Sequence, residues 1–455
     1  MPGGARLGEL RMKLKLAAAA AFLLCLLLSG CMIGTALYKL PEVSRDFENL
    51  QAKTEEALAL GAEYSAPLTG TNRQSVQLVD LNGDGADEAV AFFKIDSEDK
   101  PLKAYIYRLI GDSYVTAGMI EADGTAFDTI EYVQLDGEGS LELLVGTRLS
   151  METPQVMNVF SINGFSPVLL GQVTYTGYTL FDLDGDSVPE LMTASLNSSG
   201  QTGKVSMYKI VDGSVQESGE VQLSGGITSL YSIKTGMLSD KAHAVFFTSQ
   251  YADGGKITDI VTLKRGYLQN ITFDEATGCS TGTIVSSPVA VEDINSDQVL
   301  EIPRPSAVLD MKEENPVDGC YCVTWKAYSS GGRYSTAMTT FHNISEGWHI
   351  NLAGLEGYTL TASRYNSSSG TRCTTVYGRK DKGNPVELFK IYVLTGDNRY
   401  SRVNSTSSFL LMTKDVTVYA GHMSDSMGMT DEEGRAFLTE RFSLSRSAWI
   451  TGEVN

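Results

Sequence analysis

The sequence predicts a mainly β protein: a β-propeller of about five to seven four-stranded blades, followed by a small α+β domain. Two observations lead to this prediction. An acidic segment of nine residues recurs along the chain, beginning at residues 80, 134, 182 and 293, with a faint copy near residue 239. Each copy is flanked by short apolar and β-branched runs, which indicate strands joined by tight turns. The recurrence ends near residue 341, where the composition changes.

Four strand-like runs can be placed in each repeat. In the first repeat they cover residues 76–79, 89–93, 104–107 and 114–117, with the acidic segment between the first two. Successive copies begin 48 to 57 residues apart. Four strands in a repeat of roughly 40 to 50 residues are typical of a propeller blade. We therefore expect residues 64–345 to form the propeller, with each acidic segment as a hairpin loop.

The remaining part, residues 346–455, is expected to form a small α+β domain with a mostly antiparallel sheet. A helix is predicted near its end, because Thr430 and Glu433 have the spacing of a capping box. The runs that read as strands cover residues 348–352, 358–362, 373–377, 386–394, 409–412 and 416–419.

Residues 31–63 are expected to form a tether that precedes the propeller. Phe47, Leu50, Ala57 and Leu58 recur at helical spacing among polar residues, which predicts a short amphipathic helix. This helix either holds the propeller away from a membrane or packs beneath it. The sequence leaves both arrangements open.

Residues 1–30 have the features of a signal peptide. Four basic residues precede an uncharged apolar run of 13 residues, which is too short to span a bilayer comfortably. The run ends in Leu28-Ser29-Gly30-Cys31, which resembles the lipobox of bacterial lipoproteins. The resemblance implies cleavage before Cys31 and acylation of its thiol, which would anchor the protein on the extracytoplasmic face of the cell membrane. An uncleaved anchor is the alternative, and it also places the rest of the chain outside the cytoplasm.

The acidic segments resemble the FG-GAP/VCBS-type repeats of integrin-α-like propellers, in which each blade carries a calcium-binding hairpin loop. Calcium prefers six to eight oxygen ligands, and alternate residues of a tight loop can supply them. Positions one, three, five and nine would offer side-chain oxygens, and position seven a backbone carbonyl. We expect about two to four structural Ca²⁺ ions. The expected ligands are Asp80, Asn82, Asp84, Ala86 and Glu88; Asp182, Asp184, Asp186, Val188 and Glu190; and Asp293, Asn295, Asp297, Val299 and Glu301.

An EF-hand does not fit these segments, because its twelfth position needs a bidentate glutamate. Ala91, Thr193 and Arg304 stand there instead. A metal-free acidic turn is the alternative for the three full copies, and for residues 134–142, which begin with Gln134, occupancy stays open. Gly85 suits the turn after position five of the first copy. Ser187 and Gln298 replace it in the other two, which should strain those loops.

A net charge of −19 argues against nucleic acid as a partner. Only four histidines occur, and no two of them form a His-x-x-x-His pair, so a zinc hydrolase is not expected. In an oxidising compartment Cys279 could pair with Cys320 or Cys322, while free buried thiols, Cys373 included, are the alternative. A metal site formed by the Cys-x-Cys pair Cys320 and Cys322 is the third alternative.

These features predict a non-catalytic, lipid-anchored propeller that binds a protein or glycan at the cell surface. Two alternatives remain: an envelope enzyme, such as a glycan-active hydrolase or lyase, and a structural subunit of an envelope complex. The sequence does not identify the ligand.

Overall fold

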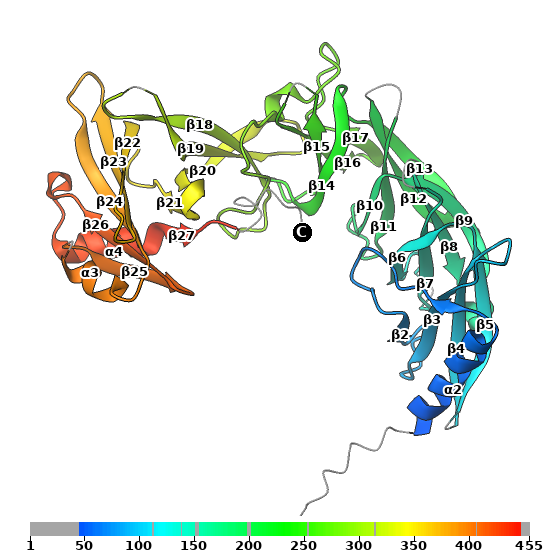
Figure 1. Ribbon diagram of the computed structural model, residues 1–455. Helices are drawn as coiled ribbons and strands as arrows, with labels where there is room; N and C mark the ends of the chain where they lie inside the picture. The colour runs from blue at the N-terminus through cyan, green and yellow to red at the C-terminus, as the bar shows by residue number, and fades with distance from the viewer. Residues whose placement is uncertain are drawn as a thin grey trace, which may run out of the picture.

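The computed structural model describes residues 45–446, apart from residues 112, 138, 151–153, 198–201, 253, 314 and 406. Its β-strands form three sheets of four strands, one of five and one of ten. In Figure 1 these sheets follow one another in an open arc, with α2 (Arg45–Ala59) at one end and α3 (Arg399–Ser405) at the other. The prediction of a mainly β protein with four-stranded propeller blades is therefore confirmed.

The first four blades are antiparallel meanders in which each strand pairs with the next one along the chain. In the first blade, the short β1 (Glu63–Tyr64) pairs with β3 as well, beyond the end of β2. The strands of each blade, in chain order, are β2 (Val76–Val79), β3 (Glu88–Lys94), β4 (Leu102–Ile110) and β5 (Ser113–Ala122); β6 (Ala126–Val133), β7 (Glu142–Arg148), β8 (Gln155–Ser161) and β9 (Val168–Tyr175); β10 (Gly177–Phe181), β11 (Glu190–Leu196), β12 (Gly203–Val211) and β13 (Ser214–Gln222); and β14 (Ile227–Met237), β15 (His243–Tyr251), β16 (Lys256–Lys264) and β17 (Tyr267–Asn270).

Each blade buries its second and third strands most deeply. The run from Ala89 to Phe93 in β3 is fully buried, and so are Leu143 to Val145 in β7 and Ala244 to Phe247 in β15. These strands are buried on both faces, because each blade packs between two neighbouring elements, which for the first blade are the N-terminal helix and the second blade. This is why the second strand of the first, second and fourth blades contains a continuous apolar run rather than an alternating one.

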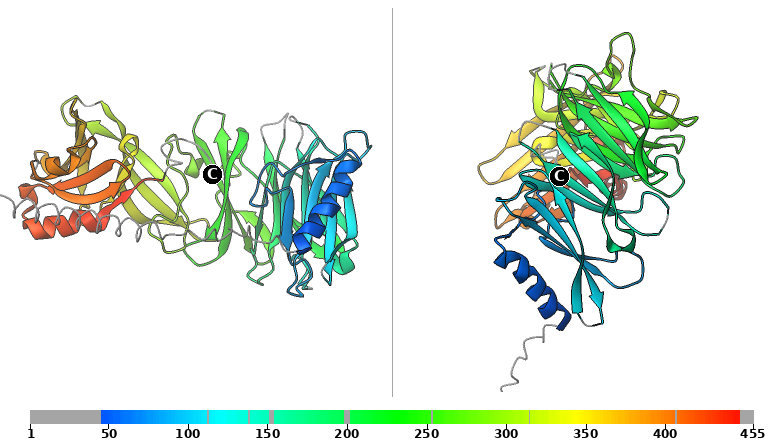
Figure 2. Two further views of the ribbon diagram at one scale, coloured as in Figure 1. Left: turned by 60° about the horizontal axis from the view of Figure 1, so that its bottom comes forward. Right: turned by 90° about the vertical axis from the view of Figure 1, so that its right-hand side faces the viewer.

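The helix predicted in the tether is α2 (Arg45–Ala59), and it packs on the first blade. Leu50 and Ala57 are buried against a cluster that includes Ala91 and Phe93. The Asn49 side-chain oxygen accepts the backbone N–H of Tyr114 in β5 at 2.6 Å. Figures 1 and 2 show α2 lying beside this blade. The described part of the tether is thus a component of the folded protein.

A buried carboxylate joins the third and fourth blades. Asp259 in β16 accepts the N–H of Ser224 at 3.0 Å and the hydroxyls of Ser224 and Ser280 at 2.7 and 2.6 Å. The side-chain amide of Asn270 donates to it at 2.7 Å. Four donors on one fully buried carboxylate reduce the cost of burying its charge, although burial still raises the pKa of Asp259, and they fix the segment that leads to the fifth blade.

The fifth repeat belongs to the ten-stranded sheet. Its loop is followed by β18, β19 and β20, which pair in sequence like strands two to four of a blade. Its first strand is reduced to a single bridge between Glu292 and Glu301. The sheet runs in the order β25 (Phe409–Lys414), β26 (Thr417–Met423), β24 (Val386–Leu394), β23 (Thr371–Lys380), β22 (Tyr358–Asn366), β18 (Glu301–Asp310), β19 (Pro316–Tyr328), β20 (Tyr334–Asn343), β21 (Trp348–Asn351) and β27 (Phe442–Leu444).

This sheet crosses the expected division between residues 345 and 346, because β20 pairs with β21 and β18 pairs in parallel with β22. Two helices accompany its far half: α3 (Arg399–Ser405), which the sequence did not predict, and α4 (Asp431–Arg441). The helix α4 begins with the expected capping box between Thr430 and Glu433. Along the chain, the boundary between the separate blades and the ten-stranded sheet therefore lies near residue 300, where β18 begins.

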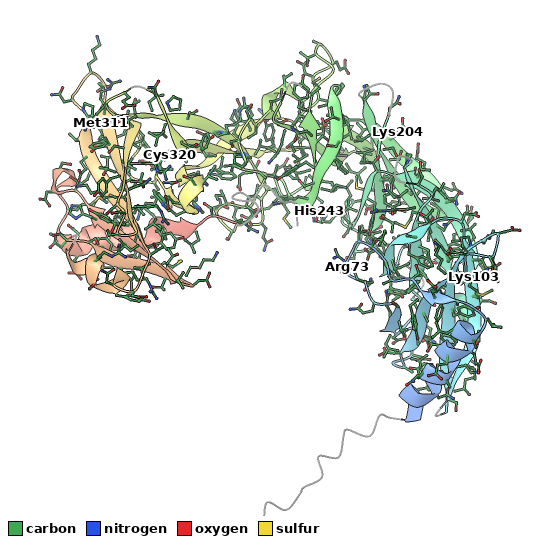
Figure 3. The ribbon with its side chains drawn as sticks, viewed as in Figure 1. Arg73, Lys103, Lys204, His243, Met311 and Cys320 are labelled. Carbon is green, nitrogen blue, oxygen red and sulfur yellow. The ribbon has the colours of Figure 1, made fainter. Side chains whose placement is uncertain are left out.

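The four described cysteines, Cys279, Cys320, Cys322 and Cys373, are all free thiols in this structure. Cys320, labelled in Figure 3, is fully buried in β19, and burial raises the pKa of its thiol to about 12. Of the alternatives left open by the sequence, the structure contains the free thiols.

Two histidines stack between neighbouring strands of the ten-stranded sheet. His342 in β20 lies opposite His349 in β21, with ring centroids 4.8 Å apart. Burial lowers the pKa of His349 to about 4, and burial together with His349 lowers the pKa of His342 well below its usual value. Both rings are therefore neutral at pH 7.

We predict that the protein loses stability through this pair as the pH falls from about 6.5 to about 4. The unfolded chain takes up protons near pH 6.5, whereas the folded pair resists them until about pH 4, so acid favours unfolding. In His349→Gln, the slope of unfolding free energy against pH should be shallower in this window. The variant His422→Gln controls for the loss of an imidazole elsewhere in the same sheet, and equal slopes in all three proteins would contradict the prediction.

Candidate functional site

The first residue of each full acidic loop organises the loop through its carboxylate. In the first loop, Asp80 Oδ1 accepts the N–H of Gly83 at 2.7 Å, and Oδ2 accepts that of Gly85 at 2.8 Å. Asp182 accepts N–H groups from Gly185, Asp186 and Ser187 in the same way. Asp293 accepts those of Asp297 and Gln298. The loop backbone thus wraps around the carboxylate, which keeps further lone pairs for a cation.

The residue after position five adopts a left-handed conformation in all three loops. Gly85 has a φ of 87°, Ser187 of 73° and Gln298 of 72°. A side chain in this region costs roughly 1–2 kcal/mol, which glycine avoids. The strain expected at Ser187 and Gln298 is therefore present.

Positions three, five and seven are linked by short hydrogen bonds. Asn82 donates to Asp84 Oδ2 at 2.9 Å, and Asn295 donates to Asp297 Oδ2 at 3.0 Å. The hydrogen bond from Asn82 is the largest of the effects that lower the pKa of Asp84. The residues at position seven, whose carbonyl oxygens were expected to be calcium ligands, donate their backbone N–H groups to the carboxylate at position five. They are Ala86, Val188 and Val299, at 2.8 Å in each case.

The glutamate at position nine is buried in all three loops and also in the degenerate copy. One of its oxygens accepts the N–H of the residue at position two. The pairs are Glu88 with Leu81 at 3.0 Å, Glu142 with Leu135 at 2.7 Å, Glu190 with Leu183 at 2.8 Å and Glu301 with Ile294 at 3.2 Å. Burial raises the pKa values of Glu142 and Glu301 to about 7.

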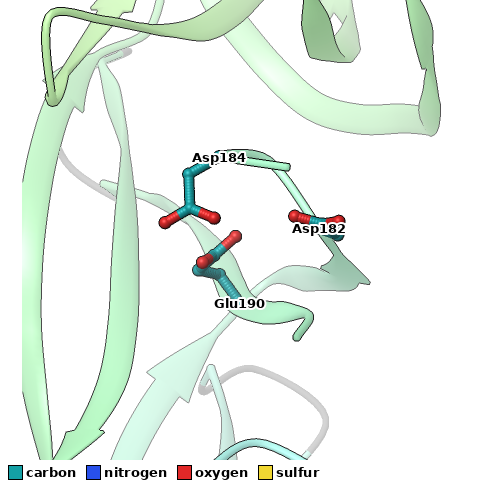
Figure 4. A group of neighbouring side chains, drawn as sticks. All are labelled: Asp182, Asp184 and Glu190. Atoms are coloured by element: carbon teal, nitrogen blue, oxygen red, sulfur yellow. The ribbon is translucent and has the colours of Figure 1, made fainter. Parts of the chain in front are cut away.

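The carboxylates of Asp182, Asp184 and Glu190 form the densest acidic cluster (Figure 4). Their oxygens lie within 4.8 Å of one another, and such a group could hold a metal ion. No other three such side chains come as close together in the described part of the chain. Asp186, an expected ligand of the same loop, is not in this cluster and accepts the N–H of Val188 instead.

A lysine from a neighbouring strand already contacts this cluster. Lys209 Nζ in β12 lies 2.6 Å from Asp184 Oδ2 and 2.9 Å from Glu190 Oε1. Burial alone would lower the pKa of Lys209, but its two carboxylate partners outweigh burial and raise it. The ammonium group therefore supplies the positive charge that a metal ion would otherwise bring.

Lys209 is not among the residues predicted from the sequence, although a signal for it is present. A basic residue follows tyrosine at the same point of the third strand in two blades, as Tyr107-Arg108 and Tyr208-Lys209. In the fifth blade the residue opposite Glu301 is Ala327, which carries no charge.

Glu301 therefore has an unmatched oxygen. Its side chain is fully buried, and no hydrogen-bond partner for Oε1 is present among the described residues. Burial raises its pKa first, and the nearby Asp297 and Asp293 add to the shift. A buried oxygen without a partner, in a loop with two further carboxylates, is a donor that a hard cation fits.

Contacts join the first loop to the second, the third to the fourth and the fourth to the fifth, and the loops form a row. The N–H of Leu141 donates to the carbonyl of Leu81, which joins the first two loops. His243, labelled in Figure 3, has Nδ1 2.6 Å from the carbonyl oxygen of Asp182. Lys241 Nζ lies 3.5 Å from the carbonyl oxygen of Asp297. The faint copy near residue 239 has lost its ligands, and Asp240 instead accepts hydrogen bonds from Ser330.

The expected lipidation site, Cys31, lies outside the described residues. No helix in the described part of the chain is long and apolar enough to cross a membrane.

No protein-family model and no curated protein matches the sequence. Among solved structures, rhamnogalacturonan lyase YesW is similar at a TM-score of 0.28 and 13% identity, covering 71% of this chain and 74% of that one. The Bacillus licheniformis rhamnogalacturonan lyase PL11 gives 0.26 and 14%, covering 72% and 71%. The Dos1 propeller gives 0.26 and 10%, covering 60% and 65%. Similarities this weak carry no argument about function.

We predict that Lys209→Met destabilises the metal-free protein by about 1–3 kcal/mol, because Asp184 and buried Glu190 lose their shared counter-charge. Added calcium should then raise the melting temperature of the variant by more than that of the wild type, since the cluster becomes open to the ion. The control is Lys204→Met. Lys204 lies on the same strand as Lys209, but it pairs with Glu220, which is outside the loops. If the melting curves of Lys209→Met match those of the wild type both in EGTA and in calcium, Lys209 is not the counter-charge of Asp184 and Glu190.

Proposed function

We propose that the protein is a lipid-anchored, extracytoplasmic, calcium-binding β-propeller that acts as a protein- or glycan-binding module at the cell surface. The observation that carries the calcium part is the buried, unmatched oxygen of Glu301 in a loop of three carboxylates. The row of loops would then carry ions along one edge of the arc. Each ion would neutralise carboxylates and stiffen a hairpin.

Several features support a binding role over a catalytic one. The carboxylates of the loops are engaged by the loop backbone or by Lys209, and His342 and His349 are enclosed in a sheet. These groups are held for structure, which leaves the arc as a scaffold that presents its surface to a ligand. A glycan-active envelope enzyme is the alternative, and turnover of a glycan that is abolished by one carboxylate substitution outside the loops would favour it.

Calcium is predicted to stabilise the protein, because only the folded state assembles the oxygen ligands. The gain per site would be about 2.7 kcal/mol at a hundredfold excess over the dissociation constant. Thermal melts in EGTA and in calcium measure it. Asp293→Ala should reduce the calcium-dependent shift, whereas Asp240→Ala should leave that shift unchanged. If the melting curve of the wild type is the same in EGTA and in calcium, the loops are metal-free turns.

Membrane attachment is predicted to depend on Cys31. In Cys31→Ser the thiol that would accept the lipid is missing, so the protein should accumulate as an unprocessed precursor or leave the membrane. Membrane fractionation with detection of the precursor and mature forms measures this, and Cys25→Ser within the apolar run is the control. A Cys31→Ser protein that is cleaved and still membrane-bound would contradict lipid anchoring.

A further inference from the structure

A polar cavity lies between residues 284–287 and the strands β18 and β19. Its volume is about 410 Å³, and it is separate from the acidic loops. Ligand pockets are typically roughly 300–1,000 Å³, so it is large enough for a small molecule. The lining residues that matter here are Ser286, Ser287, Arg304, Pro305, Ser306 and Tyr321.

Arg304 gives this cavity a positive charge. Its Nη1 donates to the carbonyl oxygen of Ile284 at 3.1 Å, and it forms no ion pair with any described residue. No aspartate or glutamate is among the residues that line the cavity. In a chain with a net charge of −19, a pocket that has a cation and lacks a carboxylate is suited to an anion.

The other polar groups of the lining are hydroxyls. Ser286, Ser306 and Tyr321 supply three of them, and Ser287 a fourth. The Ser287 oxygen accepts the N–H of Val289 at 3.3 Å, so its hydroxyl remains a donor. The rings of Pro305 and Tyr321 add apolar surface. One guanidinium, several hydroxyls and two apolar faces match a sugar ring that carries a single carboxylate, because the one cation can pair with the carboxylate while the hydroxyls bond the sugar hydroxyls.

The walls of the cavity are held in place before any ligand binds. Val285 and Lys256 exchange both backbone hydrogen bonds at 2.8 Å. The Thr283 hydroxyl donates to the carbonyl of Thr258 at 2.7 Å. Arg304 lies in β18, opposite Thr324 of β19. A preformed site loses less conformational entropy on binding.

We propose that this cavity binds the carboxylate-bearing unit of an acidic saccharide, with Arg304 paired to the carboxylate and the hydroxyls of the lining bonded to the sugar. This inference rests on the proposed function and deepens it, because it names the class of glycan. The site lies on the fifth blade and does not require an ion in the loops.

The test is ligand-observed NMR with the full-length protein in detergent micelles. The probes are D-galacturonate, its neutral counterpart D-galactose, and the simple anions acetate and phosphate. We expect galacturonate to bind, and galactose and acetate to bind at least about tenfold more weakly. Arg304→Gln should weaken galacturonate binding by about tenfold to a hundredfold, as expected for a lost charge-assisted hydrogen bond. Arg304→Lys keeps the charge but loses the planar guanidinium with its paired donors. Its affinity for galacturonate should lie between those of the wild type and Arg304→Gln.

The matched control is Arg333→Gln, an exposed arginine outside the cavity lining, which should bind as the wild type does. A thermal melt of each variant establishes that it is folded. Galacturonate binding that is unchanged in folded Arg304→Gln would overturn this site, while the glycan-binding function would stand. Equal binding of acetate or phosphate and galacturonate would reduce the site to an anion site and overturn the saccharide assignment. Absence of galacturonate binding to the wild type would overturn the inference, while the calcium-dependent melts test the proposed function separately.

Discussion

A buried carboxylate that accepts the N–H of the second loop residue sets the geometry at the entry to four of the five blades. The glutamate begins the second strand of its blade, so the bond ties the loop to the strand that is most deeply buried. An unpaired buried N–H would cost about 1–3 kcal/mol, which makes these glutamates structural whether or not a cation is present. The fourth blade lacks the glutamate, and there the N–H of Leu238 donates to the carbonyl of Ala242 instead. That exchange explains how the repeat survives where the acidic pattern is lost.

Each buried glutamate would place a negative charge in the interior, and the surroundings of this charge differ from blade to blade. Glu190 uses the ammonium group of Lys209, which also contacts Asp184. Glu142, in the copy that begins with glutamine, has a pKa raised by burial to about 7. Glu301 has neither a lysine nor a second hydrogen bond among the described residues. The loops that look alike in sequence are therefore unlike in electrostatics.

The fifth blade connects the repeats to the rest of the protein. Its strands β18 to β20 belong to the ten-stranded sheet, and their buried side chains share one hydrophobic cluster with β23, β24 and the helix α4. Glu292, in the reduced first strand, pairs with Lys234 of the fourth blade and with Arg446 near the end of the described chain. This junction also contains the cavity at Arg304. The blade that carries the unmatched glutamate thus also carries the site that we propose for a saccharide.

The sequence by itself determined the blades, because a repeated loop and the apolar runs around it are local patterns. The start of α4 was equally local, since Thr430 and Glu433 make the capping box within one turn. The strain at Ser187 and Gln298 was also predictable from the sequence, because these residues stand where the first loop has a glycine. Only the tertiary structure decided which residues neutralise which loop, because Lys209 reaches Asp184 across 25 residues of chain. The join of β18 to β22 and the cavity at Arg304 likewise depend on segments far apart in the chain. Pairing between distant strands depends on register and packing, and these leave no periodic trace in the sequence.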